Sequence, residues 1–230
     1  MGVNKDMARA AEHDSVGERS YRRIRTDIIA GKLAPAEKLR LDRLREDYGT
    51  SVSTLRELLN RLASEGLVVA EGHRGFEVAP VSAGNLREVA AMRLLLECHA
   101  LERSFIAGDM EWEGRVVSAH HKLATTERRM LTGDDAENEA WKRYDWEFHH
   151  ALISACGSRS LLEAHAATCD KYQRYLMIAM TYRGDIVASE HRDLLNCALK
   201  RDSARAQRLL TQHIEGCVDY TLAAGSKVGK

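Results

Sequence analysis

The stretch that decides the fold of the first part of the chain is STLRELLNRLASEGLVVAEGHRGFEVA, residues 53–79. Its first half spaces leucines as on one face of a helix, and residues 67–79 alternate around a glycine-rich turn. This pattern predicts a helix from Ser53 to Glu65, followed by a two-stranded hairpin. The hairpin is the only β structure that the sequence predicts.

Two further helices are expected upstream of this stretch. Ser15 and Glu18 form a capping box at the start of a helix over residues 15–30, and a short helix is expected from about residue 40 to residue 47. Helix, helix, turn, helix and hairpin is the order of a winged helix-turn-helix, whose third helix enters the major groove of DNA. We therefore expect a DNA-binding domain over residues 16–80.

The candidates for DNA contact lie in the helix-turn-helix, chiefly at the start of its third helix, and at the hairpin tip. Hydroxyl side chains can hydrogen-bond phosphates or base edges, arginines can reach bases, and a basic hairpin tip can enter the minor groove. The expected contacts are Arg43, Ser51, Ser53, Thr54, Arg56, His73 and Arg74. Residues 1–80 hold 14 lysines and arginines against 13 acidic residues, so a basic surface must come from arrangement rather than net charge.

Beyond Pro80 the chain has the pattern of a helical domain. Glycines at positions 108, 133, 157 and 184 interrupt the periodic segments, and the capping residues near them predict about six helices over residues 81–222. The protein is therefore expected to be mainly α-helical. Residues 1–15 are expected to be disordered, and residues 223–230 to form a flexible tail.

Three of these helical segments carry metal-type ligands on their inward apolar stripes. Asp145 and His149 lie one turn apart in one segment, and His191 and His213 lie in two others. Burying an unpaired carboxylate is costly and buried imidazoles need partners, so a shared cation explains all four residues economically. For any single histidine, a hydrogen-bonded core residue is the alternative.

An aspartate with three histidines is a mixed oxygen and nitrogen ligand set. It suits Zn²⁺ best, with Ni²⁺ and Mn²⁺ as alternatives. Cys217, one turn beyond His213, is a weak candidate for a further ligand, and Glu147 and Glu190 are expected to point away from the stripes. The histidines expected on solvated faces are His120, His121, His150 and His165. The five cysteines include no CxxC pair, which favours reduced thiols.

Several segments together resemble the GntR family of bacterial transcription regulators. IRTDIIAGKLAPAEKL after Tyr21, then LRELLNRLASEGLV and GHRGFEVAPVS, are similar to its DNA-binding domain. The pattern DxxFH from Asp145, EH at 190–191 and the histidine at 213 resemble the metal motif of its FadR-like subfamily with an FCD-type ligand-binding domain. The resemblance covers about residues 16–222 and implies an antiparallel all-helical C-terminal bundle. The length and the six expected helices favour the VanR-like branch.

The same resemblance implies a homodimer that binds a palindromic operator and releases it, or binds it differently, when a small carboxylate metabolite binds beside the metal. Arg93 is the leading partner of that effector because it follows the family pattern R-x-x-x-E with Glu97; an intrahelical pair with Glu97 is the alternative. The other effector candidates are Arg159, Tyr172, Arg174 and Tyr175. Ala36 stands where the family usually has glycine.

The expected function is a metabolite-responsive, sequence-specific DNA-binding transcription regulator that acts as a repressor, and not an enzyme. A metal-dependent hydrolase or lyase using the same four ligands is the alternative, and a purely structural metal is a third interpretation. The sequence contains no HExxH, GxSxG or phosphate-binding loop. Because no apolar run could span a membrane and the first 15 residues lack the core of a signal peptide, we expect the protein in the cytoplasm.

Overall fold

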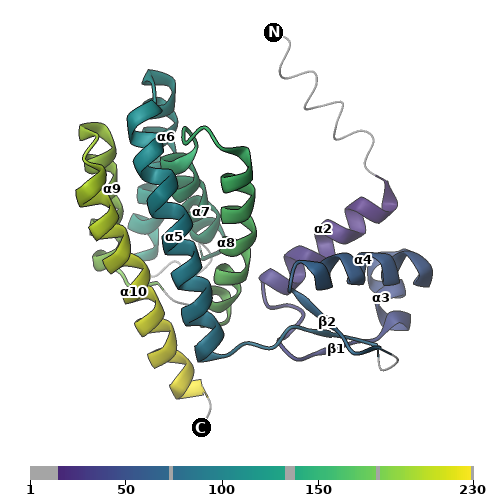
Figure 1. Ribbon diagram of the computed structural model, residues 1–230. Helices are drawn as coiled ribbons and strands as arrows, with labels where there is room; N and C mark the ends of the chain where they lie inside the picture. The colour runs from purple at the N-terminus through teal and green to yellow at the C-terminus, as the bar shows by residue number, and fades with distance from the viewer. Residues whose placement is uncertain (1–14, 73–74, 133–137, 180–181, 229–230) are drawn as a thin grey trace. The chain divides into compact units, whose positions relative to one another are not determined.

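The computed structural model describes residues 15–72, 75–132, 138–179 and 182–228. Within these ranges the chain forms nine helices and three short strands (Figure 1). The expected fold class, mainly α-helical, is therefore confirmed. The chain divides into two compact units between Val81 and Ser82.

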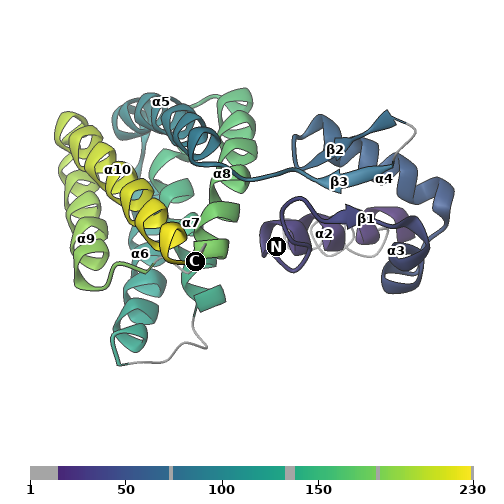
Figure 2. The same cartoon turned by 90° about the horizontal axis from the view of Figure 1, so that it is seen from below.

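The first unit is a winged helix-turn-helix. Its elements are α2 (Val16–Ile29), β1 (Lys38–Leu39), α3 (Leu41–Tyr48), α4 (Val52–Ser64), β2 (Val68–Ala70) and β3 (Phe76–Val78). The strand β3 lies between the other two and pairs antiparallel with both (Figure 2). Phe76 lies opposite Leu39, and Val78 lies opposite Val68. The sequence did not predict β1, since two residues are too few to show an alternation.

Local signals in the sequence account for the helix boundaries of this unit. The Ser15 hydroxyl accepts a hydrogen bond from the Glu18 backbone N–H at 3.1 Å and begins α2. Gly49 ends α3 with a left-handed φ of 63°, which glycine adopts without steric cost, and so makes the turn to α4. The core of the unit includes the buried side chains of Ile24, Ile28, Leu44, Leu58, Leu62 and Val68.

Ala36 lies in a left-handed conformation with a φ of 61°. Its backbone N–H donates to the Val78 carbonyl at 3.0 Å, which fixes the position of β1 against the sheet. A residue with a Cβ is strained in this conformation and glycine is not. The strain explains why glycine is usual at this position in the family that the sequence resembles.

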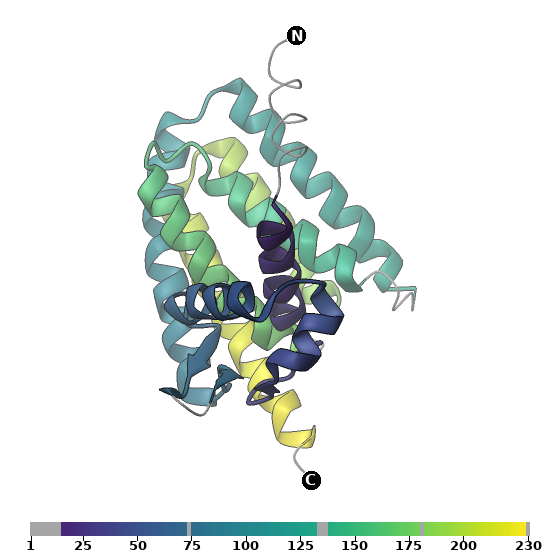
Figure 3. The same ribbon diagram turned by 90° about the vertical axis from the view of Figure 1, so that its right-hand side faces the viewer.

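The second unit is a bundle of helices (Figure 3). They are α5 (Ala83–Ala107), α6 (Met110–Met130), α7 (Asn138–Ile153), α8 (Arg159–Ala179), α9 (Asp185–Lys200) and α10 (Ser203–Val228). In the described residues this is the expected number of six. The helix α5 packs against α7, α8 and α10, and α6 packs against α7 and α9.

Some expectations at the ends and turns differ from the structure or lie outside it. The helix α10 continues to Val228, so the flexible tail expected from residue 223 is wrong as far as residue 228. Residues 1–14 and Gly133 lie outside the described residues. Of the helices that the structure describes, none has both the length and the apolar character needed to cross a lipid bilayer. All five cysteines are free thiols, and four of them are buried.

Candidate metal centre and DNA interface

The four expected metal ligands meet in the centre of the second unit. Asp145 and His149 come from α7, His191 from α9 and His213 from α10. Each offers one ligand atom, and these four atoms all lie within 4.8 Å of one another. All four residues are buried, with Asp145 the most exposed at 7%. Helical periodicity placed each ligand on an inward face, and packing of the bundle brings together residues up to 68 positions apart, from Asp145 to His213.

Two of the imidazole nitrogens in this cluster have no hydrogen-bond partner. The Nε2 atoms of His149 and His191 are both buried and unsatisfied. His149 Nε2 lies 3.9 Å from Asp145 Oδ1, beyond hydrogen-bond distance, and His191 Nε2 lies 3.1 Å from the same atom without meeting the geometry of a hydrogen bond. Buried polar atoms are nearly always satisfied in folded proteins. Two orphaned ring nitrogens beside one carboxylate fit the donor set of a transition-metal ion.

Each histidine of the cluster donates its Nδ1–H to a different glutamate. The pairs are His149 with Glu97 at 2.5 Å, His191 with Glu127 at 2.7 Å and His213 with Glu190 at 2.8 Å. Because a carboxylate only accepts, each ring carries its hydrogen on Nδ1 and turns Nε2 toward the other ligands. Carboxylates placed in this way orient histidine ligands and raise their basicity toward a metal.

Sequence reasoning missed this ring of glutamates. The expectation that Glu190 points away from the site is wrong, because its carboxylate reaches both His213 and Arg183. Glu147 does point away and pairs with Lys122. Glu97 was considered only as a partner of Arg93, and Glu127 was not considered. The only feature of the sequence that could have predicted these two residues is a glutamate on the inward face of an otherwise apolar helix.

The cluster holds its groups in defined charge states. Burial disfavours a charged imidazole, but the carboxylates of Asp145 and Glu127 outweigh it and raise the pKa of His191 to about 9. Burial, together with the charges of His191 and His149, lowers the pKa of His213 to about 3 despite Glu190. The histidine side chains around Asp145 outweigh its burial and keep its pKa below the usual range.

With the three histidines neutral, as they must be to bind a metal, the formal charges of the cluster sum to an excess of two negative charges. Its four carboxylates are Glu97, Glu127, Asp145 and Glu190. Two guanidinium groups oppose them, with Arg93 Nε 2.8 Å from Glu97 Oε2 and Arg183 Nη2 2.6 Å from Glu190 Oε2. Buried charge is costly unless it is compensated. A bound divalent cation would bring the sum to zero.

The effector candidates are divided between the cluster and the surface. Arg93 is buried, and its Cζ lies 4.8 Å from the centre of the Tyr172 ring, whose hydroxyl is buried without a hydrogen-bond partner. Tyr175 donates to Asn85 Oδ1 at 2.8 Å, away from the ligands. Arg174 is buried. The structure does not bring Arg159 to the site, because its side chain is 92% exposed and pairs with Glu163.

A second group of metal-type residues lies beside the first. Glu97, His165 and Cys169 offer ligand atoms within 4.8 Å of one another. The guanidinium of Arg93, paired with Glu97, opposes a cation there, and burial raises the pKa of the Cys169 thiol to about 12. His165 was expected on a solvated face, which is wrong: it is fully buried because it hydrogen-bonds Glu97 at 3.1 Å.

The start of α4 presents the expected hydroxyl groups to solvent. Ser51 caps the helix by accepting from the Thr54 backbone N–H at 3.1 Å, and its hydroxyl lies 2.8 Å from that of Ser53. Arg56 is exposed one turn into the helix. Arg43, on α3, is 69% exposed and lies 3.5 Å from Glu37 and Asp47.

The remaining two DNA candidates, His73 and Arg74, lie outside the described residues. Two arginines of α2 and α4 that were not among the expected contacts are engaged within the unit. Arg61 pairs with Glu18 and lies 3.6 Å from the centre of the Tyr21 ring. Arg25 pairs with Glu65 at 3.2 Å. Of the expected DNA contacts that the structure describes, Arg43 and Arg56 are the two exposed arginines.

Comparison with known proteins matches both units. Residues 17–78 match the family model "Bacterial regulatory proteins, gntR family", and residues 88–216 match that of the FCD domain. The transcriptional regulator BphR of Paraburkholderia xenovorans is 37% identical over 98% of this chain and 95% of its own length. The transcriptional repressor GlaR of Escherichia coli is 31% identical over 84% of this chain and 90% of its own.

Solved structures share the fold at lower identity. Escherichia coli McbR/YncC superposes with a TM-score of 0.74 at 18% identity, covering 91% of this chain and 98% of its own. A GntR regulator from Rhodococcus sp. RHA1 superposes with a TM-score of 0.73 at 21% identity, covering 90% and 98%. Both likenesses extend over the winged unit and the helical bundle together.

Proposed function

This chain belongs to the gntR family of bacterial regulatory proteins with an FCD domain and is a DNA-binding transcription regulator, and we propose that it is a repressor controlled by a metal-bound carboxylate effector. The family consists of regulators rather than enzymes, so the hydrolase or lyase interpretation of the ligand set is not favoured. Its E. coli relative GlaR is named a repressor, which supports the sign of regulation.

The observation that carries the metal proposal is the convergence of Asp145 with three histidines whose Nδ1 atoms are all engaged by glutamates. This arrangement leaves one nitrogen of each ring for a cation, and the excess of two negative charges favours a divalent one. Zn²⁺ suits this set best, with Ni²⁺ or Mn²⁺ as alternatives. A metal held by four protein ligands can still accept an oxygen ligand if it is five- or six-coordinate.

The effector proposal rests on what surrounds the ligands. An acid that binds a metal through its carboxylate needs a cation or hydrogen-bond donors for its remaining oxygen atoms. Arg93 carries a buried charge that acts on Asp145, and the Tyr172 hydroxyl is a buried donor without a partner. These two residues are the best candidates for the effector site, with Arg174 and Tyr175 behind them.

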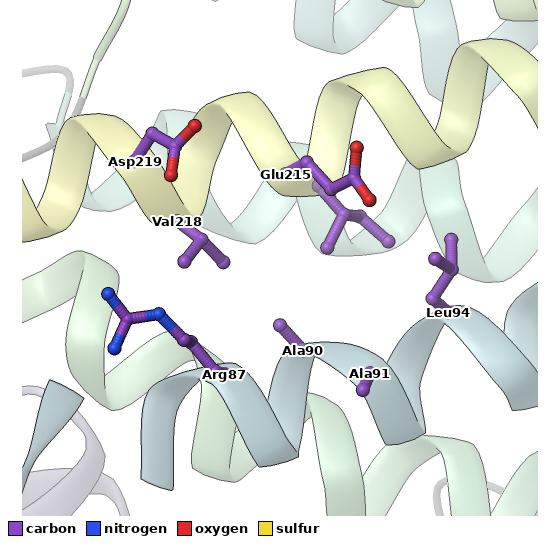
Figure 4. Close-up of a pocket in the computed structure, with 8 residues that line it drawn as sticks. Arg87, Ala90, Ala91, Leu94, Glu215, Val218 and Asp219 are labelled. Atoms are coloured by element: carbon purple, nitrogen blue, oxygen red, sulfur yellow. The ribbon is translucent and has the colours of Figure 1, made fainter. Parts of the chain in front are cut away.

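A homodimer is supported by the outer face where α5 lies beside α10. A hollow of about 340 Å³ lies there. Figure 4 shows Ala90 and Ala91 of α5 lining it, and Arg87 of α5 on the opposite side from Asp219 of α10. On the outer side of α5, Leu95 is 67% exposed. An apolar hollow rimmed by both signs of charge suits a self-complementary contact with a second copy. A Leu95→Glu variant should sediment as a monomer, and an unchanged dimer would exclude this face.

The decisive test measures DNA binding with and without organic acids. A DNA site is first selected from a random library by the protein itself, and its affinity is then measured by fluorescence anisotropy across a panel of aromatic acids and sugar acids. One acid should change the affinity by about 5- to 150-fold. Asp145→Ala should abolish this response and retain DNA binding, because Asp145 lies in the other unit.

The control for this experiment is the metal-free wild-type protein. An effector response that survives intact without metal would mean that the metal is only structural and that the acid binds elsewhere. A protein that selects no DNA sequence would contradict the regulatory function itself.

A further inference from the structure

Arg183 lies on the segment that leads into α9, and its guanidinium is buried against α10. Its Nη1 and Nη2 atoms donate to the two carboxylate oxygens of Glu190 at 3.2 and 2.6 Å. Nη2 also donates to the backbone carbonyl of His213 at 3.2 Å. The side chain is only 9% exposed. A bidentate pair between a planar guanidinium and a carboxylate fixes the orientation of the carboxylate as well as its position.

A glycine in α10 provides the space for this guanidinium. A Cβ added at Gly216 would lie 2.8 Å from Arg183 Nη1 and 3.4 Å from Arg183 Cζ. Glycine weakens the middle of a helix, so its presence inside the long helix α10 calls for a packing reason. The close approach of Arg183 is that reason. Sequence analysis assigned no role to either residue.

The three glutamates that hold the histidines differ in how firmly they are themselves held. The side chains of Glu97 and Glu127 are 0% and 2% exposed, whereas that of Glu190 is 19% exposed. Glu97 is fixed by Arg93 on its own helix. Glu190 could turn toward solvent if Arg183 did not hold it. The orientation of the His213 ring, which bonds Glu190 through Nδ1, therefore depends on an arginine from a connecting segment.

We propose that Arg183 is a positioning residue for the metal site: it holds Glu190, and through Glu190 it holds His213 in the orientation that binds the ion, while Gly216 leaves the space for it. This inference rests on the proposed metal site. Through Arg183, the segment before α9 therefore helps to orient one metal ligand, His213. Partners that orient histidine ligands usually contribute 10- to 100-fold to metal affinity.

Gly216→Ala separates this role from a general effect on the fold. The added methyl group should displace the guanidinium, which is the end of a flexible side chain, while alanine improves the helix. The gain in helix propensity and the loss of the Arg183–Glu190 pair act in opposite directions on stability, so we expect the metal-free variant to unfold within a few degrees of the wild type, and to bind Zn²⁺ about 10- to 100-fold more weakly. The matched control is Gly114→Ala in α6, where the added Cβ meets nothing within 4 Å.

Arg183→Met and Arg183→Lys test the guanidinium directly. The Arg183→Met variant should lose Zn²⁺ affinity by the same factor. The Arg183→Lys variant should retain part of that affinity, because lysine keeps the positive charge but cannot form the bidentate pair. Arg201→Met is the matched control. Arg201 also bonds a glutamate, Glu113, and a backbone carbonyl, that of Phe105, but it contacts no metal ligand. Its loss should lower the unfolding temperature and leave Zn²⁺ affinity unchanged.

All variants are compared as the full chain. Zn²⁺ affinity is measured by competition with a chromophoric chelator, and the unfolding temperature is measured after removal of metal. Equal Zn²⁺ affinity in the wild type, Gly216→Ala and Arg183→Met would overturn the role of Arg183 while leaving the metal site standing. A wild-type protein that takes up no Zn²⁺ would overturn the metal site itself, so the two failures are distinguishable.

Discussion

Binding of Zn²⁺ to the metal-free protein should release about one proton per chain near pH 7, and His191 should be its source. The ring of His191 lies between two carboxylates, with Nδ1 2.7 Å from Glu127 and Nε2 3.1 Å from Asp145. They raise its pKa to about 9, so the metal-free ring is protonated on both nitrogens at neutral pH. A metal can bind Nε2 only after that proton has left.

The size of the effect follows from this pKa. At pH 7 the ring is about two units below its pKa, so deprotonation costs about 2.7 kcal/mol and weakens the apparent metal affinity about 100-fold. The affinity should rise about tenfold per pH unit up to pH 9 and then level off. The same charge stabilises the metal-free fold below the reference pKa of 6.5, and this contribution is lost as the pH rises through about 9.

Calorimetric titration with Zn²⁺ in two buffers of different ionisation enthalpy counts the released protons. Glu127→Gln removes one of the two carboxylates, and it should lower both the number of protons and the steepness of the pH dependence. Glu147→Gln is the control, because Glu147 pairs with Lys122 outside the cluster. Metal binding without proton release in the wild type, or equal release in Glu127→Gln, would refute the reasoning.

Three further predictions concern residues outside the cluster. Arg56→Ala and Ser53→Ala should weaken binding to the selected DNA, by about 1–3 kcal/mol if Arg56 contacts a base, without changing metal content; a parallel fall in melting temperature would instead assign Arg56 to the fold. Ala36→Gly should raise the free energy of unfolding by about 1 kcal/mol in urea titrations, because it relieves the left-handed φ of 61°, and a decrease would show that no strain is present. Burial lowers the pKa of Lys142 to about 8, so its charge opposes folding below that pH. At pH 7 the Lys142→Met variant should therefore be as stable as the wild type or more stable by about 1 kcal/mol. Above pH 10.5 it should be equally or less stable, and urea titrations at the two pH values measure both differences.

The helices of both units could be predicted because each carries its own signal in the sequence. The hydroxyl at Ser15, the glycine at position 49 and the leucine spacing of α4 act within a few residues, which is the range that a sequence pattern covers. The strand β1 could not be predicted in this way. It exists because Leu39 pairs with Phe76, a contact that no local pattern encodes.

The candidate ligands could be predicted for the same reason, and their partners could not. His149 and Asp145 share one face of α7, so periodicity alone places them together. The glutamate that holds His149 lies 52 positions away in the sequence, and the glutamate that holds His191 lies 64 positions away. Which helix faces which is set by packing of the whole bundle, and an inward-facing glutamate becomes informative only when its neighbour is known.

The charge balance of the cluster depends on packing in the same way. The chain has 34 acidic residues and 34 lysines and arginines, a neutral sum that predicts nothing about any site. Packing gathers four carboxylates and only two guanidinium groups around the ligands, mostly out of contact with water, and such charges need local compensation. Helical periodicity therefore predicts the type of ligand. The charge of the cation that suits the site follows from the carboxylates around those ligands, and these become visible only in the folded bundle.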